Sequence, residues 1–122
     1  MKSRDTLIRL KRFQAEEKRR RVAQIEAMIA EFARMASDLD REIALEEQRN
    51  GVTDMNHYAY STYARAARVR RDNLNQSTED LRPQLEDAKA RYAEALEELS
   101  KVQSLENLSL IHISEPTRRT PI

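Results

Sequence analysis

Residues 22–51 read VAQIEAMIAEFARMASDLDREIALEEQRNG, and their spacing of apolar residues gives the strongest indication of the fold class. Its apolar residues recur at alternating spacings of three and four, which is the a/d pattern of a coiled-coil heptad. The resulting seam consists of Val22, Ile25, Ile29, Phe32, Ala36, Leu39 and Ile43. The dipeptide Asn50-Gly51 then ends the pattern in the manner of a helix C-cap and turn. We therefore expect a long first helix over about residues 3–50, followed by a turn near residue 51.

The apolar pattern resumes after the turn and predicts a second long helix over about residues 54–106, capped by Thr53 or Asp54. Its seam consists of Tyr60, Ala64, Ala67, Leu74, Leu81, Leu85, Ala88, Tyr92, Ala95, Leu99 and Val102. Two such helices joined by a short turn bury their seams against each other. The predicted fold class is therefore all-α, a long antiparallel two-helix coiled coil, or α-hairpin, over residues 1–107.

The register of the two helices follows from the turn. A short turn at Gly51 requires the residue numbers of facing positions to total about 103, and Ile29 then faces Leu74. A slip of one heptad keeps every a position opposite a d position but moves the turn away from Gly51. In the expected register Leu99 and Val102 have little to pack against, so the end that holds the termini is expected to be under-packed.

The composition favours long helices and disfavours an enzyme. Charged residues make up 35% of the chain and aromatic residues 5%, with one glycine and no cysteine. Within residues 1–107, His57 is the only histidine, and Asp54 with His57 supplies two ligands, too few for a metal site. A single glycine makes no phosphate-binding loop. We expect no catalytic residues, no cofactor and no metal.

The expected location is the cytoplasm. The sequence has no run of about 18 apolar residues that would span a membrane. The opening MKSRDTLIRLKRF is basic but lacks the apolar region and small-residue cleavage site of a secretory signal.

The last fifteen residues, LSLIHISEPTRRTPI (Leu108–Ile122), depart from the helical pattern and hold two of the three prolines. The eleven residues LSLIHISEPTR resemble the translation of a sequencing-library adapter. We expect residues 108–122 to be a disordered, artefactual tail, so that the native C-terminal sequence is replaced there.

Two groups of residues are candidates for binding partners. Residues 1–21 carry nine positive and three negative side chains, which would suit an acidic partner. Tyrosines near the turn are possible anchors for a partner protein. The candidate partner-binding residues are Lys11, Lys18, Arg19, Arg20, Arg21, Tyr58, Tyr63, Leu99 and Val102.

Other readings of these residues stay open. The basic segment lies beside the Glu-rich part of the second helix in a hairpin, so much of its charge is expected to be balanced there. Nucleic acid is a weaker alternative, because Phe13 alone is placed to stack on a base. Tyr58 and Tyr63 equally suit a place along the flank of the hairpin.

The stretch MKSRDTLIRLKRFQAEEKRRRVAQIEAMIAEFARMASDLDREI (Met1–Ile43), followed by an Asn-Gly turn and a second long helix, resembles the FliJ family of the bacterial flagellar protein-export apparatus. The resemblance covers most of residues 1–107. It implies a cytoplasmic, monomeric coiled-coil adaptor that binds the export ATPase ring, the cytoplasmic domain of the export gate and export chaperones, and meets the membrane only through them. The alternative functions are a generic structural scaffold and a basic nucleic-acid-binding coiled coil.

Overall fold

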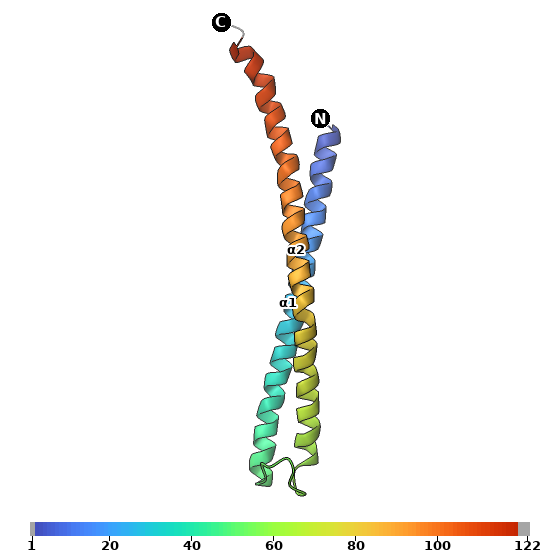
Figure 1. Cartoon of the computed structure of the whole chain (residues 1–122), viewed down its shortest axis with the longest axis vertical. Helices are drawn as coiled ribbons and strands as arrows, with labels where there is room; N and C mark the ends of the chain where they lie inside the picture. Colours follow the sequence, from blue (N-terminus) through green and yellow to red (C-terminus); the bar gives the residue numbers. More distant parts are fainter. Residues whose placement is uncertain (1, 120–122) are drawn as a thin grey trace. The chain divides into compact units, whose positions relative to one another are not determined.

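The computed structural model describes the backbone of residues 2–119 and the side chains of residues 3–105. Two helices, α1 (Lys2–Asn50) and α2 (Thr62–Arg119), pack against each other as an all-α hairpin, which confirms the predicted fold class (Figure 1). The described backbone contains no strand. None of its helices has a stretch long and apolar enough to cross a membrane.

The hairpin divides into two compact units. The turn unit consists of residues Ala23–Glu86, and the terminal unit consists of Met1–Val22 and Asp87–Ile122. Each unit contains one segment of α1 and one segment of α2. Both helices run without interruption from one unit into the other, and α2 continues through Pro83.

The predicted seams are confirmed as the buried faces of the helices. The heptad phase of Val22–Ile43 continues from Ile8 to Glu46 in α1. Every position of this phase, like every position of the second seam from Tyr60 to Val102, is buried or half-buried. The buried apolar residues are Ile8, Ala15, Ile25, Ala36, Leu39, Ile43, Tyr60, Ala64, Ala67, Leu81, Ala88 and Ala95. The side chains of α1 and α2 thus bury one stripe each, as heptad patterns require.

The predicted register is wrong by one heptad. In the turn unit Leu39, Ile43 and Ala67 form one buried cluster, and Leu74 packs against it, so Leu74 does not face Ile29. Ile43 with Ala67 gives residue numbers that total 110 rather than 103. A slip of one heptad preserves the phase of both seams, so periodicity alone does not distinguish the two registers.

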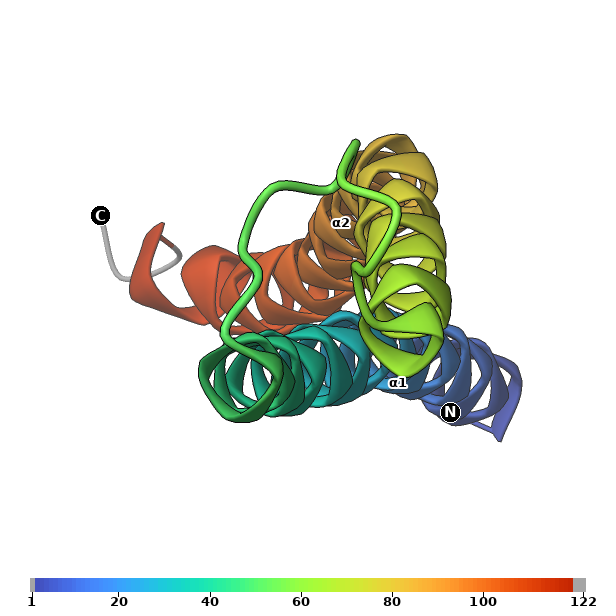
Figure 2. The ribbon, with the colours of Figure 1, turned by 90° about the horizontal axis from the view of Figure 1, so that it is seen from below.

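The register differs because the connection is longer than a tight turn. Residues 51–61 form an irregular loop between the helices, as Figure 2 shows from below. Gly51 ends α1 as predicted, with φ at +74° and its N–H donating to the Glu47 carbonyl at 2.9 Å.

The start of the second helix was also predicted too early. Ser61 is the N-cap of α2, because its hydroxyl oxygen accepts a hydrogen bond from the Ala64 N–H at 3.1 Å. Asp54, one of the two expected caps, instead accepts a hydrogen bond from the Asn56 N–H at 2.9 Å and forms a turn inside the loop. Local side-chain bonding therefore competes successfully with helix formation over residues 53–61.

The far end of α2 also differs from the prediction. The helix is bounded at Arg119 rather than near residue 106. No glycine lies beyond Gly51 and no proline lies between Pro83 and Pro116, so the sequence supplies no backbone signal that stops the helix near residue 106. The side chains of residues 106–122 and the whole of residues 120–122 lie outside the described residues. The expected disorder of residues 108–122 therefore disagrees with a helix that extends to Arg119. For residues 120–122, which lie outside the described residues, it stays a prediction.

Candidate partner-binding surfaces

A cluster of three polar side chains holds the loop against both helices. The Tyr60 hydroxyl donates to the Glu47 carboxylate at 2.7 Å and accepts from the Arg68 guanidinium at 2.8 Å. Arg68 also forms an ion pair with Glu47 at 2.8 Å. The hydrogen bonds from Arg68 and then Tyr60 lower the pKa of Glu47 below its ordinary value. We call Glu47, Tyr60 and Arg68 the Tyr60 cluster.

Further hydrogen bonds fix the loop backbone. The Asn50 side-chain amide donates to the Ala59 carbonyl at 2.8 Å, and the Ser61 hydroxyl donates to Glu46 at 3.0 Å. Arg65 donates to the Met55 carbonyl at 2.7 Å, while its guanidinium lies 5.3 Å from the centre of the Tyr60 ring. The loop is therefore an ordered part of the turn unit.

This ordered loop presents a fully exposed aromatic side chain. Tyr58 is 96% exposed, and its ring stacks on that of His57 with a separation of 4.6 Å between the ring centroids. His57 is itself fixed, because its Nδ1 accepts a hydrogen bond from the Ala59 N–H at 3.0 Å. Met55 in the same loop is also exposed. We call Met55, His57 and Tyr58 the loop surface.

Tyr63 lies on the flank of the hairpin, where one of the two sequence readings placed it. Its hydroxyl donates to the Glu42 carboxylate at 3.1 Å, and this hydrogen bond raises the pKa of Tyr63. About half of the side chain is exposed, so its ring remains open to a partner. Tyr63 therefore links the two helices through its hydroxyl.

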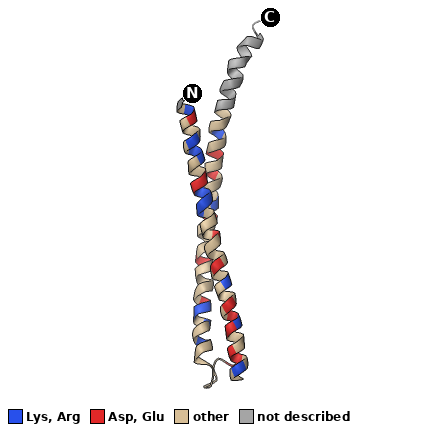
Figure 3. Cartoon of the chain, turned by 180° about the vertical axis from the view of Figure 1, so that it is seen from behind, with Lys and Arg blue, Asp and Glu red and all other residues tan. Residues whose placement is uncertain are grey.

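The basic N-terminal segment is balanced less by α2 than the sequence suggested. Figure 3 shows the basic residues gathered along this part of α1. Lys11 is the residue of this segment that pairs with α2, through Glu98 at 3.1 Å, whereas Arg19 and Arg20 both approach Glu16 on α1 itself. Among the described residues, Lys18 and Arg21 form no ion pair.

Exposed apolar side chains lie among these basic residues, and they are not among the binding residues predicted from the sequence. Leu7, Leu10 and Phe13 are 39%, 48% and 57% exposed. Arg9 and Arg12 lie between them, are exposed, and form no ion pair among the described residues. The signal was present in the sequence, because all three apolar residues fall outside the a/d seam that Ile8 and Ala15 define. We call Leu7, Arg9, Leu10, Arg12 and Phe13 the N-terminal surface.

The predicted under-packing of Leu99 and Val102 is not observed. Both side chains are half-buried in the terminal unit. The Lys11–Glu98 pair, whose residue numbers total 109, shows that the shifted register also holds in this unit. That register places Leu99 and Val102 at the levels of Lys11 and Ile8, and Ile8 is buried.

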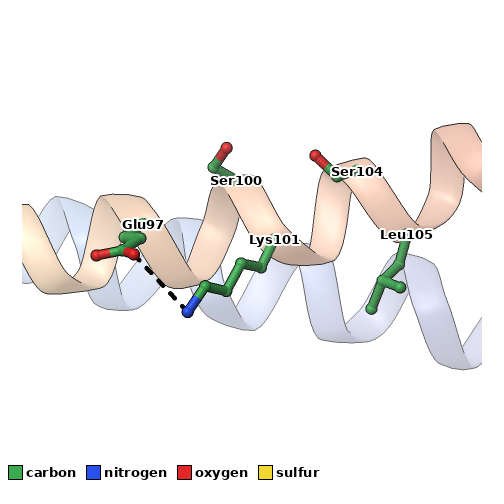
Figure 4. A pocket seen from close by; sticks show the side chains of 5 residues that line it. All are labelled: Glu97, Ser100, Lys101, Ser104 and Leu105. Atoms are coloured by element: carbon green, nitrogen blue, oxygen red, sulfur yellow. Dashed lines mark ion pairs between the residues drawn. The ribbon is translucent and has the colours of Figure 1, made fainter.

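A shallow surface hollow on α2 carries no recognisable chemistry. Glu97, Ser100, Lys101, Ser104 and Leu105 line it, and all five come from one helix (Figure 4). Lys101 lies 3.8 Å from Glu97, an exposed pair one helical turn apart. The hollow is thus a feature of one helix face.

No group of three or more metal-ligating side chains occurs among the described residues. That the chain is not an enzyme stays a prediction. No protein-family model, curated protein or solved structure matches the chain.

Proposed function

We propose that this chain is a non-enzymatic adaptor that binds other proteins through its N-terminal surface and its loop surface. One observation carries the proposal: in the N-terminal surface, exposed Leu10 and Phe13 alternate with Arg9 and Arg12, which form no ion pair among the described residues. Exposed apolar side chains beside unpaired charges are typical of a surface that binds another protein.

The chemistry of the N-terminal surface suits an acidic partner. Leu10 and Phe13 supply apolar area that a partner can bury, and the arginines donate several hydrogen bonds to carboxylates. A positive surface also speeds the encounter with a negative one. Tyr58 adds a second contact, because a tyrosine held on an ordered loop loses little conformational freedom on binding.

We propose further that the adaptor serves bacterial flagellar protein export, with the export ATPase ring, the export gate and export chaperones as partners. The support is the resemblance of Met1–Ile43 to the FliJ family together with the antiparallel hairpin. The proposed location is the cytoplasmic face of the export apparatus.

Genetic complementation tests this proposal. A bacterial strain that lacks its own FliJ receives either the full chain or a form in which residues 108–122 are replaced by the C-terminal segment of the host FliJ. We expect the second form to restore motility and to retain purified export ATPase and gate domain in pull-downs. Failure of both forms in both assays, with the proteins shown to be folded, would overturn the export assignment.

The surface itself is tested by matched variants. Leu10→Ser with Phe13→Ser should reduce pull-down of the partner at least tenfold, whereas Leu45→Ser with Val69→Ser should not. The control residues are similarly exposed, at 52% and 56%, but lie outside the N-terminal surface. Equal loss in both double variants would contradict a specific surface.

Charge reversal at Lys18, Arg19, Arg20 and Arg21 addresses the role of charge. We expect the charge-reversal variant to bind the partner more weakly than the unchanged chain at low salt. Raising salt should weaken binding of the unchanged chain but not of the variant, because screening reduces the attraction in the first and the repulsion in the second. Salt-dependent binding of duplex DNA, with no binding of the export proteins, would instead support the nucleic-acid alternative.

A further inference from the structure

Two registers of the turn unit bury the same seam residues. Ala67 lies with Ile43 in the observed register and would face Ala36 after a slide of one heptad. Because the slide is a whole heptad, each a position again meets a d position. The registers therefore differ in their particular partners and not in which faces are buried.

The apolar layers do not favour one register decisively. Many seam residues of the turn unit are small or polar, namely Ala36, Ala64, Ala67, Arg71 and Thr78. Small side chains bury little area in either register. A slide that separates Ile43 from Ala67 would place Ile43 opposite Tyr60 and Ile29 opposite Leu74, so large layers form again.

Polar contacts between the helices distinguish the two registers. Tyr60 holds Glu47 and Arg68 together, and Arg71 forms an ion pair with Asp40 at 3.0 Å. A shift of seven residues moves one helix past the other by about 10 Å, which is beyond the reach of these bonds. The observed register thus depends on these polar contacts near the loop and on the Lys11–Glu98 pair of the terminal unit.

The loop contains enough residues to lengthen α2 when the helices slide. Gly51 is the only glycine, and residues 52–61 contain no proline, so no residue of 52–61 is excluded from a helix by its backbone. Thr53 or Asp54 would then cap the lengthened α2, as either residue type does commonly. The slide would wind about two helical turns at the expense of the loop.

We propose that α1 and α2 interconvert between the observed register and the register one heptad away, with the Tyr60 cluster holding the first and the winding of residues 53–61 accompanying the second. Because both helices are continuous, the slide also separates Lys11 from Glu98 in the terminal unit. Winding would also dismantle the loop surface, because Tyr58 would become a helical residue. A partner bound to Tyr58 would therefore hold the observed register. This last consequence rests on the proposed function, whereas the slide itself does not.

Disulfide trapping in the full chain tests the slide, and the chain has no cysteine to interfere. Ala67→Cys is combined with Ile43→Cys to report the observed register, or with Ala36→Cys to report the other. Ala36 lies about 10 Å from Ile43 along α1, so one register does not close both disulfides. The control combines Ala67→Cys with Ser37→Cys. Ser37 lies outside the seam, so this pair measures disulfides that form only when the chain unfolds.

The two pairs are compared in Tyr60→Phe and Tyr58→Phe backgrounds. Tyr60→Phe removes both hydroxyl contacts of the Tyr60 cluster but keeps a ring that the second register would bury. Tyr58→Phe is the matched control, because it changes the exposed tyrosine of the same loop. We expect Tyr60→Phe to raise the yield of the Ala36/Ala67 disulfide at least threefold over the control.

The oxidised proteins provide a second measurement. The protein bridged between Ala36 and Ala67 should show more helix by circular dichroism than the one bridged between Ile43 and Ala67, because loop residues have been wound. The proposal is overturned if the Ala36/Ala67 disulfide never exceeds the Ser37 control in either background. It is equally overturned if the bridged protein has the same helix content or less.

Discussion

Glu47 illustrates how one side chain fixes what the seam leaves open. Its carboxylate contacts the hydroxyl of Tyr60 and the guanidinium of Arg68, so it joins α1, the loop and α2. The hydrogen bonds stabilise the charged carboxylate, which is why its pKa is lowered and that of Arg68 is raised. A half-buried polar cluster of this kind contributes specificity as well as stability.

The pH dependence of stability should report this cluster. A lowered pKa in the folded state means that the contribution of Glu47 is present above the ordinary carboxyl pKa of 4.5 and is lost as pH falls through the folded value. Glu47→Gln should therefore lower the melting temperature at pH 7, and its effect should shrink progressively as pH falls below 4.5. Glu26→Gln, whose carboxylate forms no ion pair among the described residues, is the control. A pH-independent effect of Glu47→Gln would contradict this account.

The more deeply a side chain is buried, the more its replacement by alanine should lower the free energy of unfolding. Ile25 is 1% exposed, whereas Leu45 on the same helix is 52% exposed. We expect Ile25→Ala to lower the free energy of unfolding by about 2–5 kcal/mol. Leu45→Ala should change it by about 0.5 kcal/mol or less. Urea denaturation followed by circular dichroism measures both, and similar values for the two variants would refute the assigned seam.

At the scale of the elements, each helix end is set by a different signal. α1 ends where Gly51 adopts a positive φ, and α2 begins where Ser61 bonds to the Ala64 N–H. Both signals are local, but only the first was recognised in the sequence. Ser61 was overlooked because Thr53 and Asp54 are equally good caps that lie closer to the turn.

The C-cap of α1 yields a backbone prediction. A Cβ added at Gly51 would meet no heavy atom within 4 Å, so Gly51→Ala tests conformation rather than packing. The positive φ should cost the alanine variant about 1 kcal/mol of unfolding free energy. Gly51→Asn should cost clearly less, because asparagine tolerates this conformation. Chemical denaturation provides the comparison, and equal losses would argue against a backbone origin.

At the scale of the whole molecule, the two helices of one chain bury each other's seams. We therefore expect a monomer, which sedimentation equilibrium should report as 14.3 kDa over a wide range of protein concentration. A mass near twice that value would mean that chains pair through extended helices or through the exposed apolar residues. The Leu10→Ser and Phe13→Ser variant separates these cases, because it would dissociate only a dimer formed through the N-terminal surface.

Heptad spacing and a lone glycine are local signals, so the sequence alone predicts that two long helices form, the phase of both seams and the end of α1. It also contained the off-seam positions of Leu10 and Phe13. The register depends on contacts between the helices, because a one-heptad slip leaves the pattern unchanged. The Tyr60 cluster and the ion pairs Arg71–Asp40 and Lys11–Glu98 distinguish the two registers. The exposure of Tyr58 likewise depends on packing, because the eleven-residue loop over 51–61 is held by hydrogen bonds from Asn50 of α1 and Arg65 of α2.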